Sequence, residues 1–376
     1  MNPVSVVIPA VLAVLLCWYV IIWFRAESPK AHTLEWVSMY RCRHFEITGF
    51  RYRYDWMDAV WACVPAVVAA CVAFLVSWRS QGGYFGTLAA LLPAILSAVT
   101  SALIYLLLRS FSGKVPAALL GAGLFALCPF SQAGLALPVI GAMYFLWLWA
   151  TGDGYGVSVW LYLAAALAFA EAGLLLAPGF VVLLVPVLIC FAVILLHRIR
   201  KEDYSLLRAG LLLLYLLAVA AVFFLAVCVF YGAQNGMIFP ESFADGDYFT
   251  FVGAVLSQCV GEFSALQPGL TAEFLAGIFV EPVDALLMLA GFPVLIIACV
   301  RRRHIKALYL LGWNCAALLL LFLYGGDLLV LSAALVSGYL AARLIKRGRP
   351  VAAIIGGGGP ILLNLAMTVA IMILGG

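Results

Sequence analysis

Apolar runs of about 20 residues recur along most of this chain, and they constrain its fold more than any other feature. Within residues 91–178 they are separated only by short breaks at 109–114, 129–134, 151–156 and 171–173. A helix of that length crosses the ~30 Å hydrocarbon core of a bilayer, where only helices and closed barrels satisfy the backbone. The runs are continuously apolar rather than alternating, so we predict an all-α, polytopic membrane bundle.

The composition excludes an ordinary soluble domain. Of the 376 residues, 66% are hydrophobic and 10% are charged, whereas soluble domains carry about 45–50% and 25%. The net charge of +4 comes from basic residues in short turns, which is typical of membrane topology and predicts no nucleic-acid partner. The 10 cysteines include no C-x-x-C pair and the 4 histidines are scattered, so we predict neither a disulfide framework nor a metal centre.

The positions of the basic residues predict how about twelve helices are oriented, because short cytoplasmic loops collect Lys and Arg. Of the 21 such residues, only Arg79 falls on a predicted external side. No basic residue lies between Arg208 and Arg301, so the acidic stretch there is expected to be external. The N-terminus is then outside, and a bacterial cytoplasmic membrane is the expected location.

The same pattern divides the chain into four parts. They are an N-terminal transmembrane helix with a basic cytoplasmic or interfacial segment (1–57), a membrane core (58–231), an acidic extracytoplasmic segment (232–283) and C-terminal transmembrane helices (284–376).

Glycine, proline and polar residues predict where helices end. The sequence RSQGGYFG at 79–86 is expected to be an external turn, and the acid and glycine at 171–173 a second turn. Residues 116–128 and 135–150 are expected to form two short helices joined through the sequence PFSQ. In the last span, the glycine run at 356–359 and the following proline predict a helix break or close helix packing.

Three stretches carry a family resemblance. The sequence SAVTSALIYLLLRSFSGKVPAALLGAGLFALCP at 97–129 has a helix ending in Leu-Leu-x-Arg, a Gly-basic turn and a short helix before proline. The sequence GLLLAP follows at 173–178, and a basic turn precedes a Trp-containing helix at 301–313. Together they resemble the GT-C superfamily of polyprenyl-phosphate-dependent glycosyltransferases, in its protein O-mannosyltransferase and aminoarabinose-transferase branch.

The resemblance implies a GT-C-like membrane fold and transfer of a sugar from a polyprenyl phosphate at the extracytoplasmic face. Two positions depart from the family pattern. The first external loop, at 79–86, contains no acidic residue, and Glu171 stands where the family tends to have a lysine. A catalytically degenerate relative that still binds the carrier lipid is therefore the companion hypothesis.

The candidate catalytic residues are acids on or near the external side. Glu171 lies inside an apolar run, where an ionisable residue is a functional candidate by default, although it could also sit wet at a helix end. Asp245 and Asp247 flank a glycine and could serve as a base or bind a divalent cation, or simply form a turn. No cofactor is predicted beyond that divalent cation.

Arg79 is the candidate for binding the lipid phosphate through a charge-assisted contact, with snorkelling from its helix end as the alternative. Asp327, in a Gly-Gly-Asp turn, and Gln132 are further candidates. The expected partners are membrane lipid, a polyprenyl-phosphate sugar and another membrane protein. Two hypotheses from other classes stay open: a lipid or small-solute transporter or flippase, and a structural membrane subunit.

Overall fold

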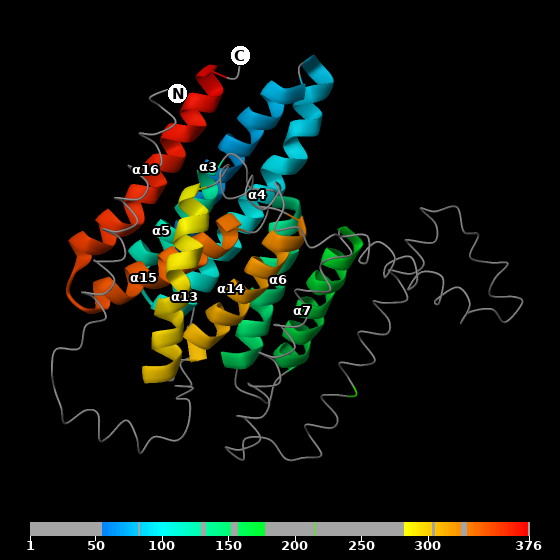
Figure 1. The fold of residues 1–376 in the computed structure, drawn as a ribbon. Coiled ribbons are helices and arrows are strands. Elements are labelled where there is room, and N and C mark those ends of the chain that lie inside the picture. Colours follow the sequence, from blue (N-terminus) through cyan, green and yellow to red (C-terminus); the bar gives the residue numbers. More distant parts are fainter. Residues whose placement is uncertain are drawn as a thin grey trace, which may run out of the picture.

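The computed structural model describes the chain at 55–81, 83–128, 133–151, 157–176, 282–302, 305–324 and 329–374, together with helical Leu214. These residues are helical and contain no strand, which confirms the predicted all-α class (Figure 1). The helices are α3 (Trp56–Gln81), α4 (Gly83–Ser112), α5 (Val115–Ala126), α6 (Ala133–Thr151), α7 (Val157–Leu176), α13 (Pro282–Arg302), α14 (Ile305–Tyr324), α15 (Leu329–Lys346) and α16 (Pro350–Leu374). The predicted first span and most of the acidic segment lie outside the described residues.

Helices α3 and α4 each contain a stretch of 23 residues that is long and apolar enough to cross a membrane. They pack side by side as a long hairpin (Figure 1). Small residues on α3, including Ala62 and Ala69, face inward, while Val60, Val64 and Val67 are exposed. Only 17% of the apolar stretch of α3 is buried, so this helix does not have the environment of a soluble protein's core helix.

Short local signals set the helix ends. Asp55 Oδ1 accepts the Asp58 backbone N–H at 3.1 Å, and Asp58 Oδ2 accepts the Asp55 N–H at 3.2 Å. This reciprocal pairing is a capping box, and it starts α3. At the end of α4, Gly113 adopts φ 65° and its N–H donates to Arg109 O at 2.8 Å. Glycine takes this left-handed conformation without steric cost, so the chain turns sharply into α5.

The predicted turn at 171–173 is wrong. The turn between α3 and α4 does fall within 79–86 but is shorter than predicted. At the glycine run, the alternative of close helix packing holds in place of a break, since a Cβ on Gly357 would lie 3.1 Å from Leu120 Cδ1. Residues 79–81 and 83–86 are helical, so only Gly82 between them lies outside the described helices. Helix α7 continues through 171–173 to Leu176, and α16 continues through the glycine run and Pro360. The neighbouring residues in each case are strongly apolar, and an apolar setting favours closed backbone hydrogen bonds over a turn.

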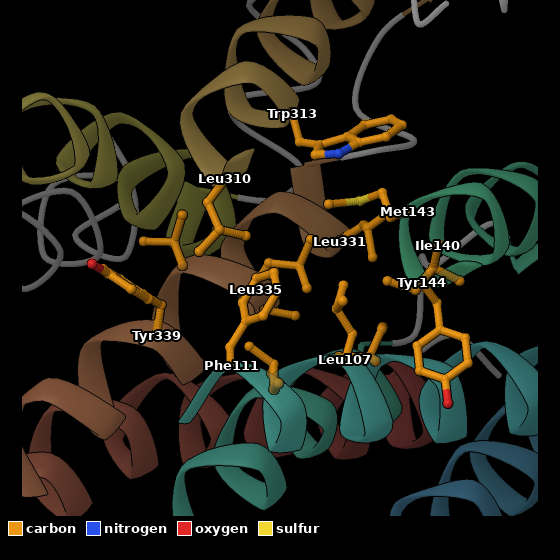
Figure 2. Close-up of a cluster of buried hydrophobic side chains, with 14 of the residues drawn as sticks. Leu107, Phe111, Ile140, Met143, Tyr144, Leu310, Trp313, Leu331, Leu335 and Tyr339 are labelled. Atoms are coloured by element: carbon orange, nitrogen blue, oxygen red, sulfur yellow. The ribbon is translucent and has the colours of Figure 1, made fainter. Parts of the chain in front are cut away.

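The core lies where α4, α6, α14 and α15 converge (Figure 2). Side chains of Leu107 and Phe111 from α4 meet Leu331 and Leu335 from α15, with α6 and α14 closing the sides. Between α6 and α14, the rings of Trp147 and Tyr309 pack with their centroids 5.7 Å apart. Tyr309 also donates its hydroxyl to Met143 O at 2.7 Å. The remaining labelled members of this cluster are Ile140, Met143, Tyr144, Leu310, Trp313 and Tyr339.

Two glycines let α5 and α15 come into close contact. A Cβ on Gly121 would lie 2.7 Å from Ala334 O, and a Cβ on Gly338 would lie 3.2 Å from Ala117 O. Leu108 of α4 inserts beside both glycines. Small residues at such crossings allow backbones to approach closely, which is the usual way that helices associate in lipid.

An ion pair joins the start of α3 to the end of α4. Arg109 Nε donates to Asp58 Oδ1 at 2.7 Å, and the two side chains are 15% and 3% exposed. Lys306 at the start of α14 donates to Phe111 O at 2.7 Å, so α14 begins at the same end of the bundle. We call this the basic end; it also carries Lys114, Arg343, Lys346 and Arg349.

The close helix contact predicts a position-specific effect of adding one methyl group. We expect Gly121→Ala to destabilise the protein by about 1–3 kcal/mol, because the new Cβ overlaps Ala334 O and Leu108. Gly123→Ala, in the same helix, is the matched control, since its Cβ would meet only Ile361 Cδ1 at 3.6 Å. That control should be neutral or stabilising, because alanine favours helix over glycine. Thermal unfolding in detergent measures both, and equal melting temperatures would contradict the contact.

The buried ion pair predicts coupling between its two residues. Asp58→Asn and Arg109→Gln should each cost about 3–5 kcal/mol, since each leaves the opposite charge buried without its partner. The double variant should lose less than the sum of the two single losses, because it leaves no unpaired charge. A double-mutant cycle of unfolding free energies tests this, and strict additivity would show that the pair does not interact.

Candidate functional site

The structure brings none of the predicted site residues together. Asp245, Asp247, Asp327 and Gln132 lie outside the described residues. Arg79 lies in the last turn of α3 and Glu171 in the last two turns of α7, and for both residues only the backbone is described. Their predicted roles in sugar transfer therefore stay predictions.

A different acid is the most deeply buried charged residue of the described helices. Asp284, in the first turn of α13, is 0% exposed. Its Oδ2 accepts a hydrogen bond from Asn364 Nδ2 of α16 at 3.4 Å. Cys128 Sγ, just beyond the end of α5, approaches the same oxygen at 4.0 Å. We call these three residues the Asp284 cluster.

The other carboxylate oxygen, Asp284 Oδ1, has no hydrogen-bond partner within the described part of the chain. A buried polar atom without a partner costs about 1–3 kcal/mol, and more when it is charged. Both contacts to Oδ2 are also long, since an N–H···O hydrogen bond is usually about 2.9–3.0 Å. The cluster is thus incompletely satisfied, which is unusual in a packed helical core.

Helix geometry explains how the three residues meet. Pro282 begins α13, so Asp284 lies among the free N–H groups of the first helical turn. The Leu127 N–H donates to Gly123 O and closes the last turn of α5, which places Cys128 at its exit. On α16, Gly357 lies against Leu120 of α5, with its would-be Cβ 3.1 Å from Leu120 Cδ1. This contact holds α16 close to α5 and brings Asn364 to the cluster.

A second polar link joins α13 to α14 and α15. Ser332 of α15 donates a very short hydrogen bond to Asn314 Oδ1 of α14, and Asn314 Nδ2 donates to Met288 O of α13 at 3.1 Å. Gly291 makes room for it, since a Cβ there would lie 2.8 Å from Val336 Cγ1. Both polar atoms of the Asn314 side chain are hydrogen-bonded, so this link holds helices together.

The chemistry available at the Asp284 cluster follows from its atoms. A carboxylate can accept a proton, accept hydrogen bonds from hydroxyl or amino groups, or bind a cation. The described residues contain no group of three or more His, Cys, Asp or Glu side chains that could hold a metal ion.

The electrostatics of the two ends of the bundle differ. At the basic end, Asp58 is paired with Arg109, and Lys306 both donates to a helix C-terminal carbonyl and lies 5.9 Å from the Trp147 ring centroid. These cations are placed favourably near negative charge and an aromatic face. The Asp284 cluster lies away from this end, at the far end of α5, and contains no basic side chain.

Comparison with known proteins finds no matching family model, no matching curated protein and no matching solved structure. The GT-C resemblance therefore remains a prediction from the sequence.

Sequence reasoning missed Asp284, Asn364, Asn314 and the Asp58–Arg109 pair. Asp284 and Arg109 stand at the edges of apolar runs, where an ionisable residue reads as a helix boundary. Asn364 and Asn314 lie well inside apolar runs. Since uncompensated amides are costly in lipid, their isolation within otherwise apolar helices was the available signal.

The polar link predicts different effects for two serines of α15. Ser332→Ala should destabilise the protein by about 1–3 kcal/mol, because Asn314 Oδ1 loses its buried donor. Ser337→Ala should be neutral or slightly stabilising, since the buried Ser337 hydroxyl has no partner among the described residues. Melting temperatures of the two purified variants test the pair, and a larger loss from Ser337→Ala would contradict it.

Proposed function

We propose that the chain is a multi-pass protein of a bacterial cytoplasmic membrane, with about twelve spanning helices and its N-terminus outside. The apolar lengths of α3 and α4 and the exposed valines of α3 support a lipid environment. The collection of Arg109, Lys114, Lys306 and Lys346 at one end supports a cytoplasmic assignment for that end.

The depth of the Asp284 cluster is the observation that supports a function. Helix α5 has 12 residues and is therefore about 18 Å long, which is shorter than the ~30 Å hydrocarbon core. Since α5 begins at the basic end, Cys128 and Asp284 would lie within the membrane, on its external half. A polar interior at that depth suits a ligand whose polar group enters from the outer leaflet while its lipid tail stays in the bilayer.

On this basis we infer a GT-C-like function: binding of a polyprenyl-phosphate-linked sugar and transfer of the sugar at the external face. In such a transfer a base, Glu171 or Asp245, accepts the proton of the acceptor hydroxyl. The acceptor oxygen bonds to the anomeric carbon, the bond from that carbon to the phosphate oxygen breaks, and polyprenyl phosphate leaves. Arg79 would hold the phosphate. A degenerate relative would keep the lipid site and lose the transfer.

A transporter or flippase is the second candidate. Complete burial of Asp284 favours it, because ionisable residues inside helical bundles commonly line solute and ion pathways. A carrier would open the cluster alternately to the two sides, whereas a transferase needs access from the external side alone. The structural-subunit hypothesis is not supported by Asp284, because a carboxylate oxygen without a partner does not help to hold helices together.

Bound lipid provides the test. Native mass spectrometry of the protein in mild detergent should find a polyprenyl phosphate, with or without its sugar, on the wild type. Arg79→Ala should reduce its occupancy by about tenfold to a hundredfold, because a hydrogen bond to a charged group contributes about 1.5–3 kcal/mol. Glu171→Gln should keep the lipid and, in an active enzyme, lose sugar transfer.

The matched control is Lys346→Ala, which removes an exposed cation from the basic end. This variant should retain the lipid at wild-type occupancy. If wild type, Arg79→Ala and Lys346→Ala all carry only bulk phospholipid, the carrier-lipid function is refuted and the transporter becomes the leading candidate.

A further inference from the structure

Asp284 is a carboxyl group buried completely within the bundle. Its position in the first turn of α13 places it at the positive end of that helix's dipole. No ion pair to Asp284 is formed by the described side chains, whose contacts to it come from the Asn364 amide and the Cys128 thiol. A buried carboxyl group either takes up a proton or pairs with a cation. The cluster therefore offers one negative partner to a cation that displaces this proton.

The end of α5 also favours a positive charge at the cluster. Cys128 follows the last turn of α5, where the backbone carbonyl groups give the negative end of the helix dipole. This negative end disfavours a second negative charge and favours a cation beside Asp284. Membrane proteins use helix C-termini and backbone carbonyls in this way to coordinate monovalent ions.

The atoms of the cluster limit the size and valence of that cation. Asp284 Oδ1 is buried and has no partner among the described residues, and the amide oxygen of Asn364 is a further oxygen ligand of the right kind. A divalent ion takes about six or more ligands, usually with several carboxylates, whereas the described residues bring a single carboxylate here. One buried negative charge balances one positive charge.

We propose that the Asp284 cluster is a binding site for a compact monovalent cation, either an alkali-metal ion or the ammonium group of a small organic solute. The cation sits against Asp284 Oδ1, with Asn364 and the end of α5 completing its shell. The site joins α5, α13 and α16, so its occupancy stabilises the contact among these helices. It does not depend on the proposed sugar transfer.

Melting temperature in detergent tests the proposal. The full-length protein is heated in sodium, potassium, methylammonium or choline chloride at equal ionic strength, choline being too bulky for the site. At a concentration about ten times the dissociation constant, the favoured cation should raise the melting temperature by roughly 2 °C over choline. Stabilisation by sodium or potassium identifies an alkali-metal site, and stabilisation by methylammonium alone identifies an ammonium site.

Two variants localise the effect. Asp284→Asn keeps the shape of the side chain and should lose the difference between cations. Asp55→Asn removes an exposed carboxylate at the basic end, keeps an oxygen for capping α3, and should respond as the wild type does. The same cation response in Asp284→Asn and wild type would place the site elsewhere and overturn the proposal.

A binding measurement on the wild type covers the case in which Asp284→Asn does not fold. Radiolabelled sodium captured on the immobilised protein should be displaced by the favoured cation and not by choline. No displaceable sodium, together with equal melting temperatures in all four salts, would also overturn the proposal. A cation response without bound polyprenyl phosphate would refute the proposed transfer while keeping this site. Bound polyprenyl phosphate without a cation response would refute this site while keeping the proposed transfer.

Discussion

The contact of α5 with α15 at Gly121 and Gly338 is the interaction on which the rest of the described structure depends. It places two backbones so close that a Cβ on Gly121 would lie 2.7 Å from Ala334 O, and it seats Leu108 of α4 beside them. Under the proposed membrane location, no hydrophobic driving force brings helices together, and fit of this kind supplies much of the association. Because α5 is held here, its far end and Cys128 are fixed against Asp284 of α13.

The helices themselves could be predicted because an apolar run in this chain has one way to satisfy its backbone. The sequence was less informative about their ends. Glycine, proline and acids signal turns in water, where an open backbone can bind solvent. Several predicted turn residues remain helical because apolar residues surround them, and there a backbone hydrogen bond within the helix costs less free energy than an exposed backbone group. They are residues 79–81, 83–86 and 171–173 and the glycine run of α16.

The site could not be predicted in the same way because its parts are far apart in the chain. Cys128 and Asp284 are separated by 156 positions, and Asp284 and Asn364 by 80. Periodicity reports which residues share a helix face, but it does not report which faces meet. Glu171 attracted attention because it interrupts an apolar run, whereas Asp284 and Arg109 stand at the edges of runs and resemble boundaries. Only the three-dimensional packing distinguishes a boundary residue from a buried one.

The two ends of the described bundle also differ in how completely their charges are balanced, and that difference locates the chemistry. At the basic end, Asp58 and Arg109 neutralise each other, and Lys306 is held by a carbonyl oxygen and an aromatic ring. Each contact there has a structural purpose. At the Asp284 cluster, a carboxylate is buried with a weakly held oxygen and an unpartnered one. Folding alone gains nothing from that arrangement, since an apolar residue would pack there at lower cost. A ligand that completes the charge supplies the missing stabilisation.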